Sequence, residues 1–388
     1  MFYISYLSIS LFVLVVGFIF KNNSNRFEWI IYVICFFTVV ILNNFGVINE
    51  NWPAFHPADE SYFYNTSLSL KDDVENGRDF IEALLATTWN YKYYGFIVFD
   101  YVSIYGAHAS EEAHKLSIAI SLSSIYLLFL RYIISKREVY IEHVRYILLP
   151  VLLYMCTLNY RDGFVSILIF FIFKSIYDRK LIGLILSIGL LAFFRVEFIQ
   201  LLTIAFIASL LISMTNLRML MLSVFTLVFT ILLILFNGKA SFDVGSFIYI
   251  PLSFNGVSLI HDLFNYYAGE HYYQGNLVML FLTVLVSLAF FIFKTFTIIL
   301  FCRSYDLYSF KERVITNTFV IFYVISLLIY NFLLDGFQDR IKVAFVGAMV
   351  FVLSMLGEKY TISNNKLFII ISIMMTLFVL IRNVRWIF

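Results

Sequence analysis

The stretch LIGLILSIGLLAFFRVEFIQLLTIAFIASLLISM, from Leu181 to Met214, decides the fold class of this chain. Its only charged residues are Arg195 and Glu197, with apolar sequence on both sides of them. A helix needs about 20 mainly apolar residues to cross the hydrocarbon core of a bilayer, which is about 30 Å thick. The stretch therefore predicts two short membrane spans, 181–194 and 196–214, that meet at Arg195.

Similar apolar runs recur along the whole chain, and the composition agrees with them. Of the 388 residues, 62% are hydrophobic and 13% are charged, whereas a soluble protein carries about 25% charged residues. We expect an all-α fold, in which residues 1–388 form one integral membrane domain, a bundle of about twelve transmembrane helices. The other predicted spans are 2–20, 29–48, 114–130, 143–158, 163–177, 219–236, 275–300, 314–334, 342–357 and 367–383. The first run lacks a basic leader and a cleavage site, which indicates a retained helix and not a signal peptide.

The distribution of Lys and Arg predicts the orientation of the bundle. The loops on one side carry more of these residues, so this side is expected to be cytoplasmic, with both termini outside. Two larger loops, 49–113 and 237–274, then face the periplasm. Within the first loop, the semi-apolar stretch Tyr91–Gly106 is expected to lie on the membrane or dip into it, with a thirteenth span as the alternative. The unusual polar clusters all fall on this outer face, which is the strongest indication of function.

Two arginines stand out on this face. Arg161, in NYRDGF, precedes a short predicted helix, and Arg195 ends the helix that returns from it. Neighbouring helices pack about 8–10 Å apart, so we expect the two guanidinium groups to grip one diphosphate, a task that suits their planar set of donors. The alternatives are an interfacial Arg161 paired with Asp162, and a local pair between Arg195 and Glu197.

The stretch HPADESYFYNTS, His56 to Ser67, follows the second apolar run. Asp59 and Glu60 are candidates for a general base near an acceptor hydroxyl, and Tyr62 and Tyr64 are candidates for stacking on sugar faces. The alternatives are a solvated acidic loop and tyrosines of the interfacial aromatic belt.

The second outer loop carries SLIHDLFNYYAGEHYYQGN, Ser258 to Asn276. Its interleaved aromatic and polar residues favour glycan binding by Tyr266 and Tyr267, with His261 as a base or as a cation near phosphate. The alternative is an amphipathic interfacial helix. Arg340, in a later outer turn, is a third candidate for anion binding, although a plain turn also explains it.

No metal site or cofactor is expected. The histidine spacing matches no zinc motif. The three cysteines, Cys35, Cys156 and Cys302, lie in or at the ends of apolar segments, so they indicate neither a disulfide framework nor a metal cluster.

These features together resemble the O-antigen and capsule repeat-unit polymerases of bacteria (Wzy type). The resemblance covers the architecture of the whole chain, and two motifs carry it: the Ala58-Asp59-Glu60 patch with Tyr62, and Arg161-Asp162 followed by a short hairpin and Arg195. It implies a GT-C-like membrane glycosyltransferase of the bacterial cytoplasmic (inner) membrane whose active face is periplasmic. The Arg-rich loop repeats of some members are not evident in this chain.

The resemblance implies one reaction. A growing glycan leaves its undecaprenyl diphosphate carrier and joins the terminal sugar of a new lipid-linked repeat unit, which yields O-antigen or capsular polysaccharide. The expected partners are the undecaprenyl-diphosphate-linked oligosaccharide, membrane lipids, and flippase and chain-length regulator proteins, with no nucleic acid. Arg161, Arg195 and Arg340 would stabilise the departing diphosphate, and Asp59, Glu60 or His261 would accept the hydroxyl proton.

Two alternatives remain open from the sequence. A polyprenyl-phosphate-sugar-dependent glycosyltransferase (GT-C) also carries an acidic patch after an early span. A lipid-linked oligosaccharide flippase or other transporter predicts charges deep in many spans and Gly or Pro breaks at the midplane. With four prolines in the chain and the charges on one face, transport is disfavoured.

Overall fold

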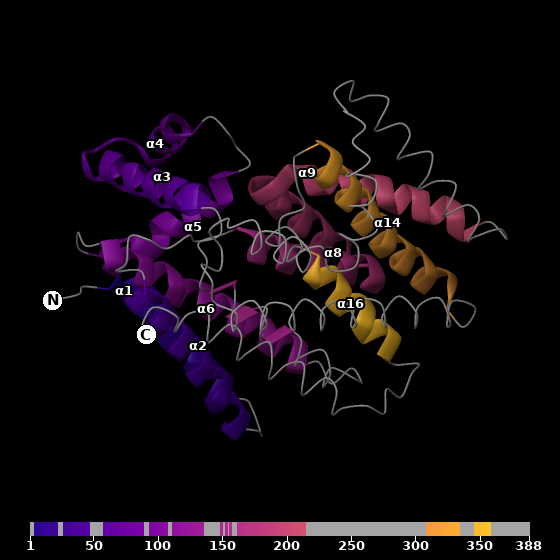
Figure 1. Cartoon of the computed structure of the whole chain (residues 1–388), viewed down its shortest axis with the longest axis horizontal. Helices are drawn as coiled ribbons and strands as arrows, with labels where there is room; N and C mark the ends of the chain where they lie inside the picture. The colour runs from indigo at the N-terminus through magenta and orange to yellow at the C-terminus, as the bar shows by residue number, and fades with distance from the viewer. Residues whose placement is uncertain are drawn as a thin grey trace, which may run out of the picture. The chain divides into compact units, whose positions relative to one another are not determined.

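The computed structural model describes residues 4–21, 26–46, 57–88, 93–107, 111–135, 148–149, 152–153, 155–156, 161–214, 308–333 and 345–357 (Figure 1). Within these ranges the long regular elements are all α-helices, ten in number, which confirms the all-α prediction for this part of the chain. The residues divide into two compact units: unit 1, Met1–Phe164 with Ile362–Phe388, and unit 2, Val165–Thr361.

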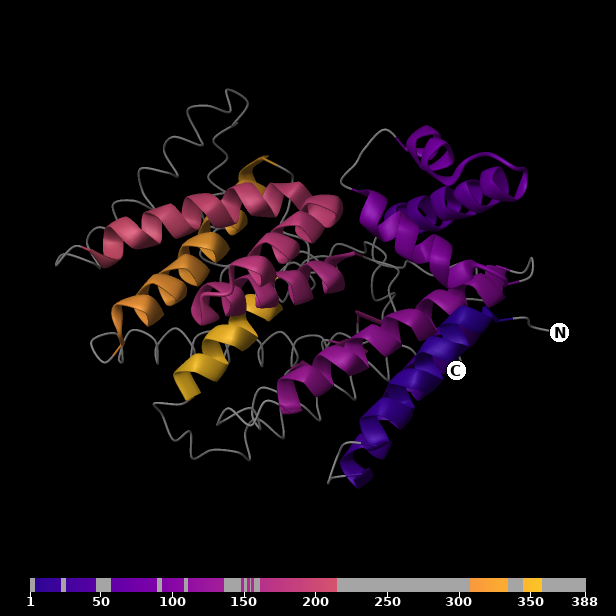
Figure 2. The same ribbon diagram turned by 180° about the vertical axis from the view of Figure 1, so that it is seen from behind.

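Unit 1 is built around one long helix, α6. Its described helices are α1 (Tyr6–Lys21), α2 (Arg26–Gly46), α3 (Pro57–Glu75), α4 (Phe80–Thr87), α5 (Tyr94–Ile104) and α6 (Glu111–Ser135). Helices α1, α2 and α5 pack on α6, and α3 packs on α4 and α5 (Figures 1 and 2). The predicted spans 2–20, 29–48 and 114–130 thus correspond to α1, α2 and α6.

A row of serines joins α1 to α5 and α6. The Ser8 hydroxyl lies 2.8 Å from the Ser121 hydroxyl and donates to the Ser103 carbonyl oxygen at 2.9 Å, and the Ser5 amide donates to the Ser117 hydroxyl at 3.0 Å. Small polar side chains let two apolar helices approach closely, and their hydroxyl groups form hydrogen bonds with the neighbouring helix. The serines therefore explain how helices of such apolar composition pack in one register.

The segment 49–113, predicted as an outer loop, is largely helical. It contains α3, α4, α5 and the first residues of α6. The 11 residues of α5 extend about 16 Å at about 1.5 Å per residue, which is short of the roughly 30 Å of a bilayer core. This length favours the interpretation that Tyr91–Gly106 lies on the membrane or dips into it, and a thirteenth span stays the alternative.

Unit 2 contains α9 (Leu181–Ser213), α14 (Phe310–Leu333), α16 (Val346–Gly357) and most of α8 (Asp162–Asp178). Helix α14 packs along α9 and also contacts α16, and Phe351 of α16 packs on Phe170 and Tyr177 of α8 at ring-centroid distances of 5.8 and 5.7 Å. A Cβ on Gly347 would overlap the Ser166 carbonyl oxygen. Glycine is thus required where the backbones of α16 and α8 approach.

Helix α9 is broken at the residue where the sequence predicts two spans to meet. Arg195 has an extended backbone (φ −165°, ψ 82°) inside an otherwise helical run. The predicted boundary between 181–194 and 196–214 is confirmed as this break. The predicted spans 163–177, 314–334 and 342–357 correspond to α8, α14 and α16. Of the predicted span 143–158, the structure describes six residues, and all six are helical and buried.

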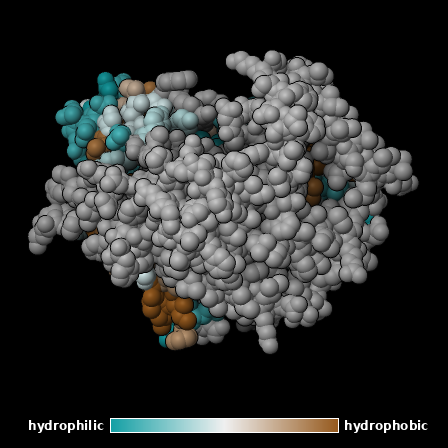
Figure 3. Space-filling view, viewed as in Figure 1, coloured by the Kyte–Doolittle hydropathy of each residue, from teal (hydrophilic) through white to brown (hydrophobic). Residues whose placement is uncertain are grey.

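Two of the described helical segments, Ala113–Ile134 and Leu181–Ser213, are long and apolar enough to cross a membrane. In Figure 3, hydrophilic residues gather over α3 and α4, and an apolar patch lies at the end of the α1–α2 hairpin, where Phe18 and Phe27 are exposed. The predicted spans 219–236, 275–300 and 367–383 and the loop 237–274 lie outside the described residues.

Candidate functional site

Helix α3 carries the first half of the candidate site. It begins at Pro57, whose fixed φ and missing N–H suit the first position of a helix. Asp59 and Glu60 fall in the first turn, one helical turn before Tyr62, Phe63 and Tyr64. Negative side chains in a first turn also complement the helix dipole, which gives the acidic patch a structural role beside any chemical one.

Tyr62 stands at the surface, where its side chain is 40% exposed. Its ring packs edge-on against Tyr93, with centroids 5.5 Å apart. Its hydroxyl lies 3.0 Å from the Thr88 hydroxyl, and the Tyr94 hydroxyl donates to the Thr88 carbonyl oxygen at 3.0 Å. These contacts hold Tyr62 as a fixed, solvent-facing aromatic platform.

Arg161 contacts the Tyr93 ring, as Tyr62 does, and is 91% buried. Its guanidinium carbon lies 4.5 Å from the centroid of the Tyr93 ring and 6.0 Å from that of Phe63. A guanidinium over an aromatic face gains about 0.5–2 kcal/mol, with the larger values where water is excluded. The stacking fixes the plane in which the five N–H donors of Arg161 point. We call Tyr62, Phe63, Tyr93 and Arg161 the Arg161 cluster.

The residues after Arg161 are clamped by α5 and α6. The Phe164 ring packs on Phe99 and Phe96 at 4.7 and 5.9 Å between centroids, and a Cβ on Gly163 would overlap the Tyr126 hydroxyl. Gly163 is therefore required for the start of α8 to lie directly against α6. These contacts determine where the backbone places Arg161.

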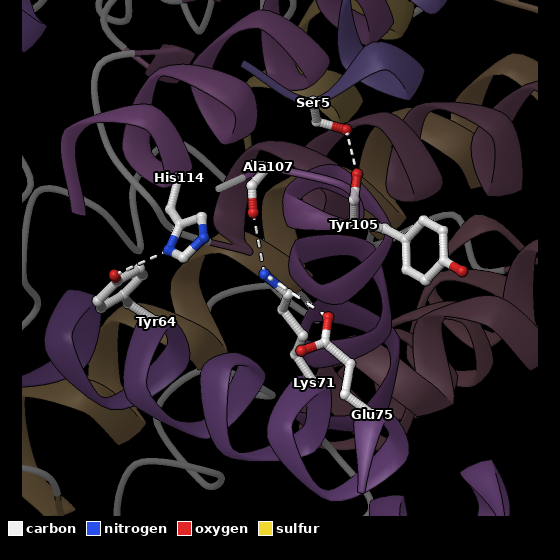
Figure 4. Close-up of polar contacts among 7 residues, drawn as sticks. All are labelled: Ser5, Tyr64, Lys71, Glu75, Tyr105, Ala107 and His114. Carbon is white, nitrogen blue, oxygen red and sulfur yellow. Dashed lines mark hydrogen bonds and ion pairs between the residues drawn. The ribbon is translucent and has the colours of Figure 1, made fainter. Parts of the chain in front are cut away.

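Tyr64 faces a different neighbour. Its hydroxyl lies 3.1 Å from Nδ1 of His114, which is buried in α6 (Figure 4). About two helical turns further along α3, the buried Lys71 ammonium donates to the Ala107 carbonyl oxygen at 3.0 Å and lies 3.9 Å from Glu75 (Figure 4). Both contacts tie α3 to the residues that lead into α6, and they place Tyr64 outside the Arg161 cluster.

Arg195 sits at the break in α9. It is 93% buried, and its guanidinium carbon lies 5.1 Å from the centroid of the Phe198 ring one turn later. Arg195 is described within unit 2 and Arg161 within unit 1. His261, Tyr266, Tyr267 and Arg340 lie outside the described residues, and the structure describes the backbone of Asp59 and Glu60.

Sequence reasoning missed two residues of the site region, Tyr93 and His114. Tyr93 belongs to an aromatic-rich stretch, NYKYYGF, that could have been singled out, whereas nothing in the spacing pairs His114 with Tyr64. Among the described residues, no group of three or more His, Cys, Asp or Glu side chains is arranged to hold a metal ion. No protein-family model, curated protein or solved structure matches this chain.

Proposed function

We propose that this protein polymerises undecaprenyl-diphosphate-linked oligosaccharide repeat units into O-antigen or capsular polysaccharide, by glycosyl transfer on the outer face of the cytoplasmic membrane. One observation carries the proposal. Tyr62 and Arg161, which the sequence assigns to sugar and diphosphate from segments about a hundred residues apart, lie against the same ring, Tyr93. An exposed aromatic platform next to a buried, oriented cation suits a ligand that joins a sugar to a diphosphate.

In the proposed reaction, the C–O bond between the anomeric carbon of the growing glycan and its diphosphate breaks. The electron pair leaves with the undecaprenyl diphosphate, so negative charge develops on the leaving group. Arg161 stabilises this charge, since an oriented cation in a site that excludes water acts most strongly where charge develops. Its planar fork can contact two phosphate oxygens at once, and Arg195 and Arg340 are proposed to contribute further contacts.

The acceptor sugar requires a base. As its hydroxyl oxygen forms the new bond to the anomeric carbon, Asp59, Glu60 or His261 is proposed to accept the proton. The first turn of α3 brings Asp59 and Glu60 within one helical turn of Tyr62. Tyr64, Tyr266 and Tyr267 are proposed to contact the sugars.

The proposal places the site in a GT-C-like bundle of about twelve spans, with α3, α4 and α5 at the periplasmic surface. A lipid-linked substrate keeps its polyprenyl chain in the bilayer, so its diphosphate and sugars lie at the interface. The hydrophilic surface over α3 and α4 (Figure 3), next to the Arg161 cluster, is consistent with such a position.

The first experiment is the surface-glycan gel profile of a strain that lacks this gene. We expect single repeat units on the lipid anchor without the ladder of longer chains. Complete loss of surface glycan would favour a flippase, and a shift of every band by one sugar would favour a side-branch transferase. Either of these results would overturn the polymerase assignment.

The second experiment complements that strain with single variants. Arg161→Ala is expected to restore no ladder, and Arg161→Lys is expected to restore little, because an ammonium lacks the planar fork. Arg78→Ala is the matched control: Arg78 is an exposed arginine of the same unit, in an ion pair of 2.8 Å with Asp73, and its loss should leave the ladder intact. A normal ladder from Arg161→Ala, at equal protein level, would refute the role of Arg161.

A further inference from the structure

Unit 2 has a basic end, where α8 ends, α9 begins and α14 begins. One contact between α8 and α14 is that of the Lys311 ammonium nitrogen, which lies 3.9 Å from the centroid of the Tyr177 ring. Asp178 holds two more ammonium groups, those of Lys174 at 3.1 Å and Lys180 at 3.7 Å. The basic end comprises Lys174, Arg179, Lys180, Lys311 and Arg313.

Positive charge is in excess at this end. Among the described residues there, the acidic side chains are Asp178 and Glu312. Glu312 is occupied within its own helix cap, because its carboxylate accepts from the Ser309 amide at 2.7 Å and from the Ser309 hydroxyl at 2.9 Å. In the described part of this end, Asp178 is the acidic side chain that pairs with lysines, Lys174 and Lys180. The described side chains, among them the exposed Arg179 and Lys180, carry a net positive charge.

Arg179 occupies a backbone conformation that normally selects glycine. Its φ is +55°, and the Lys180 amide donates to the Ser175 carbonyl oxygen at 2.9 Å, which is the pattern of a helix that ends in a Schellman motif. Glycine is the usual residue at this position, since an L side chain in the left-handed region is strained. The chain thus keeps an exposed arginine at the turn against the local conformational preference.

An exposed apolar stripe begins directly after these cations. The first residues of α9 are Leu181 and Ile182, which are 67% and 76% exposed. The stripe continues over the first half of α9 with Ile185, Leu186, Leu190 and Phe193, all at least half exposed. Cationic side chains at the end of an exposed apolar helix complement a molecule with an anionic head and hydrocarbon tails.

We propose that the basic end of unit 2 binds an anionic phospholipid, with its headgroup on Arg179, Lys180 and Lys311 and its acyl chains along the first half of α9. Each basic residue near a membrane surface adds to the attraction for anionic lipid. The apolar stripe distinguishes this ligand from a free phosphate, which would use the cations alone. The proposal goes beyond the glycosyl transfer and needs no glycan for its test.

The test uses the purified full-length protein in a neutral detergent and measures its thermal unfolding midpoint against added dioctanoyl phosphatidylglycerol. We expect this lipid to raise the midpoint, and dioctanoyl phosphatidylcholine or inorganic phosphate to have little effect. The double variant Arg179→Gln/Lys180→Gln should lose at least tenfold in apparent affinity for phosphatidylglycerol, and Arg78→Gln should keep it. Equal responses to both lipids, an equal response to phosphate, or unchanged affinity of the double variant would overturn the proposal.

Arg179→Gly separates binding from folding. It should raise the unfolding midpoint of the lipid-free protein, because it relieves the left-handed arginine, and at the same time weaken the response to phosphatidylglycerol. A variant that is more stable and yet binds less lipid cannot owe its lost binding to misfolding. If Arg179→Gly binds phosphatidylglycerol as the wild type does, Arg179 is not part of a headgroup site.

Discussion

The substitution Gly163→Ala tests the contact between the start of α8 and α6. The added Cβ would overlap the Tyr126 hydroxyl and lie 2.7 Å from Cζ and 3.1 Å from Cε1 of that ring. Tyr126 is completely buried, so its ring cannot move out into solvent to make room. Overpacking of this kind costs about 1–3 kcal/mol, and the better helix propensity of alanine returns up to about 1 kcal/mol. We expect a net loss of about 1–2 kcal/mol in the free energy of unfolding.

A matched control lies in α9. Gly189 is helical and nothing lies within 4 Å of the Cβ that alanine would add, so Gly189→Ala should stabilise the protein by about 0.5–1 kcal/mol. The assay is unfolding of the purified protein in mixed micelles by added SDS, followed by tryptophan fluorescence. The two variants should shift the transition in opposite directions. If Gly163→Ala is as stable as Gly189→Ala, the close approach of Gly163 to Tyr126 does not exist.

A second substitution shows whether the effect is local. Tyr126→Leu removes the hydroxyl and the two ring carbons that the alanine would meet, at the cost of a cavity. In combination with Gly163→Ala, part of that cavity is filled and the overlap is gone. The double variant should therefore be more stable than the sum of the single changes predicts, by about 1–2 kcal/mol. Strict additivity would refute the reasoning.

Three further outcomes are expected. Gly347→Ala should destabilise the protein more than Gly163→Ala, because the Cβ added at residue 347 would meet the backbone of Ser166 and not a side chain. SDS unfolding compares the two variants, and equal stability would contradict this prediction. Asn317→Ala should cost about 1 kcal/mol, since the Asn317 amide donates to the buried Ser213 hydroxyl at 3.0 Å, and Ser213→Ala in the same background should then add little. Burial raises the pKa of the Tyr101 phenol above its usual value of about 10, so the folded state binds more protons and loses stability as the pH rises above about 10. Tyr101→Phe should lessen that loss, as followed by the unfolding midpoint between pH 9 and 11.

The continuous apolar runs of the sequence predict most of the described helices, because a helix that is apolar on all sides leaves such a run. The break in α9 is predictable for the same reason: Arg195 and Glu197 are the only charged residues in such a run. The helices of segment 49–113 were not predicted, since α3 mixes polar and apolar residues without a long apolar run. A local signal was present in Asp79, whose carboxylate accepts from the Ile81 amide at 2.9 Å and caps α4.

The candidate site was only partly predictable. The residue types of Tyr62 and Arg161 follow from the chemistry of the proposed ligand, since a diphosphate sugar suits an aromatic platform and a cation. Tyr62 and Arg161 both contact the ring of Tyr93. This arrangement depends on how α3 packs on α5, and the spacing of residues in the sequence does not predict it. The need for glycine at 163 likewise arises from a neighbour, Tyr126, in a different helix, so the sequence alone does not distinguish this glycine from an ordinary helix-start residue.

The break at Arg195 has a consequence if the protein spans a membrane as we propose. A straight helix of 33 residues would be about 50 Å long and would project well beyond a hydrocarbon core of about 30 Å. Because the backbone is extended at one residue, the two halves of α9 do not share one helix axis. In the membrane bundle that we propose, hydrophobic mismatch in a thicker or thinner bilayer would act on the angle between these halves, and the buried guanidinium of Arg195 would stand at that joint.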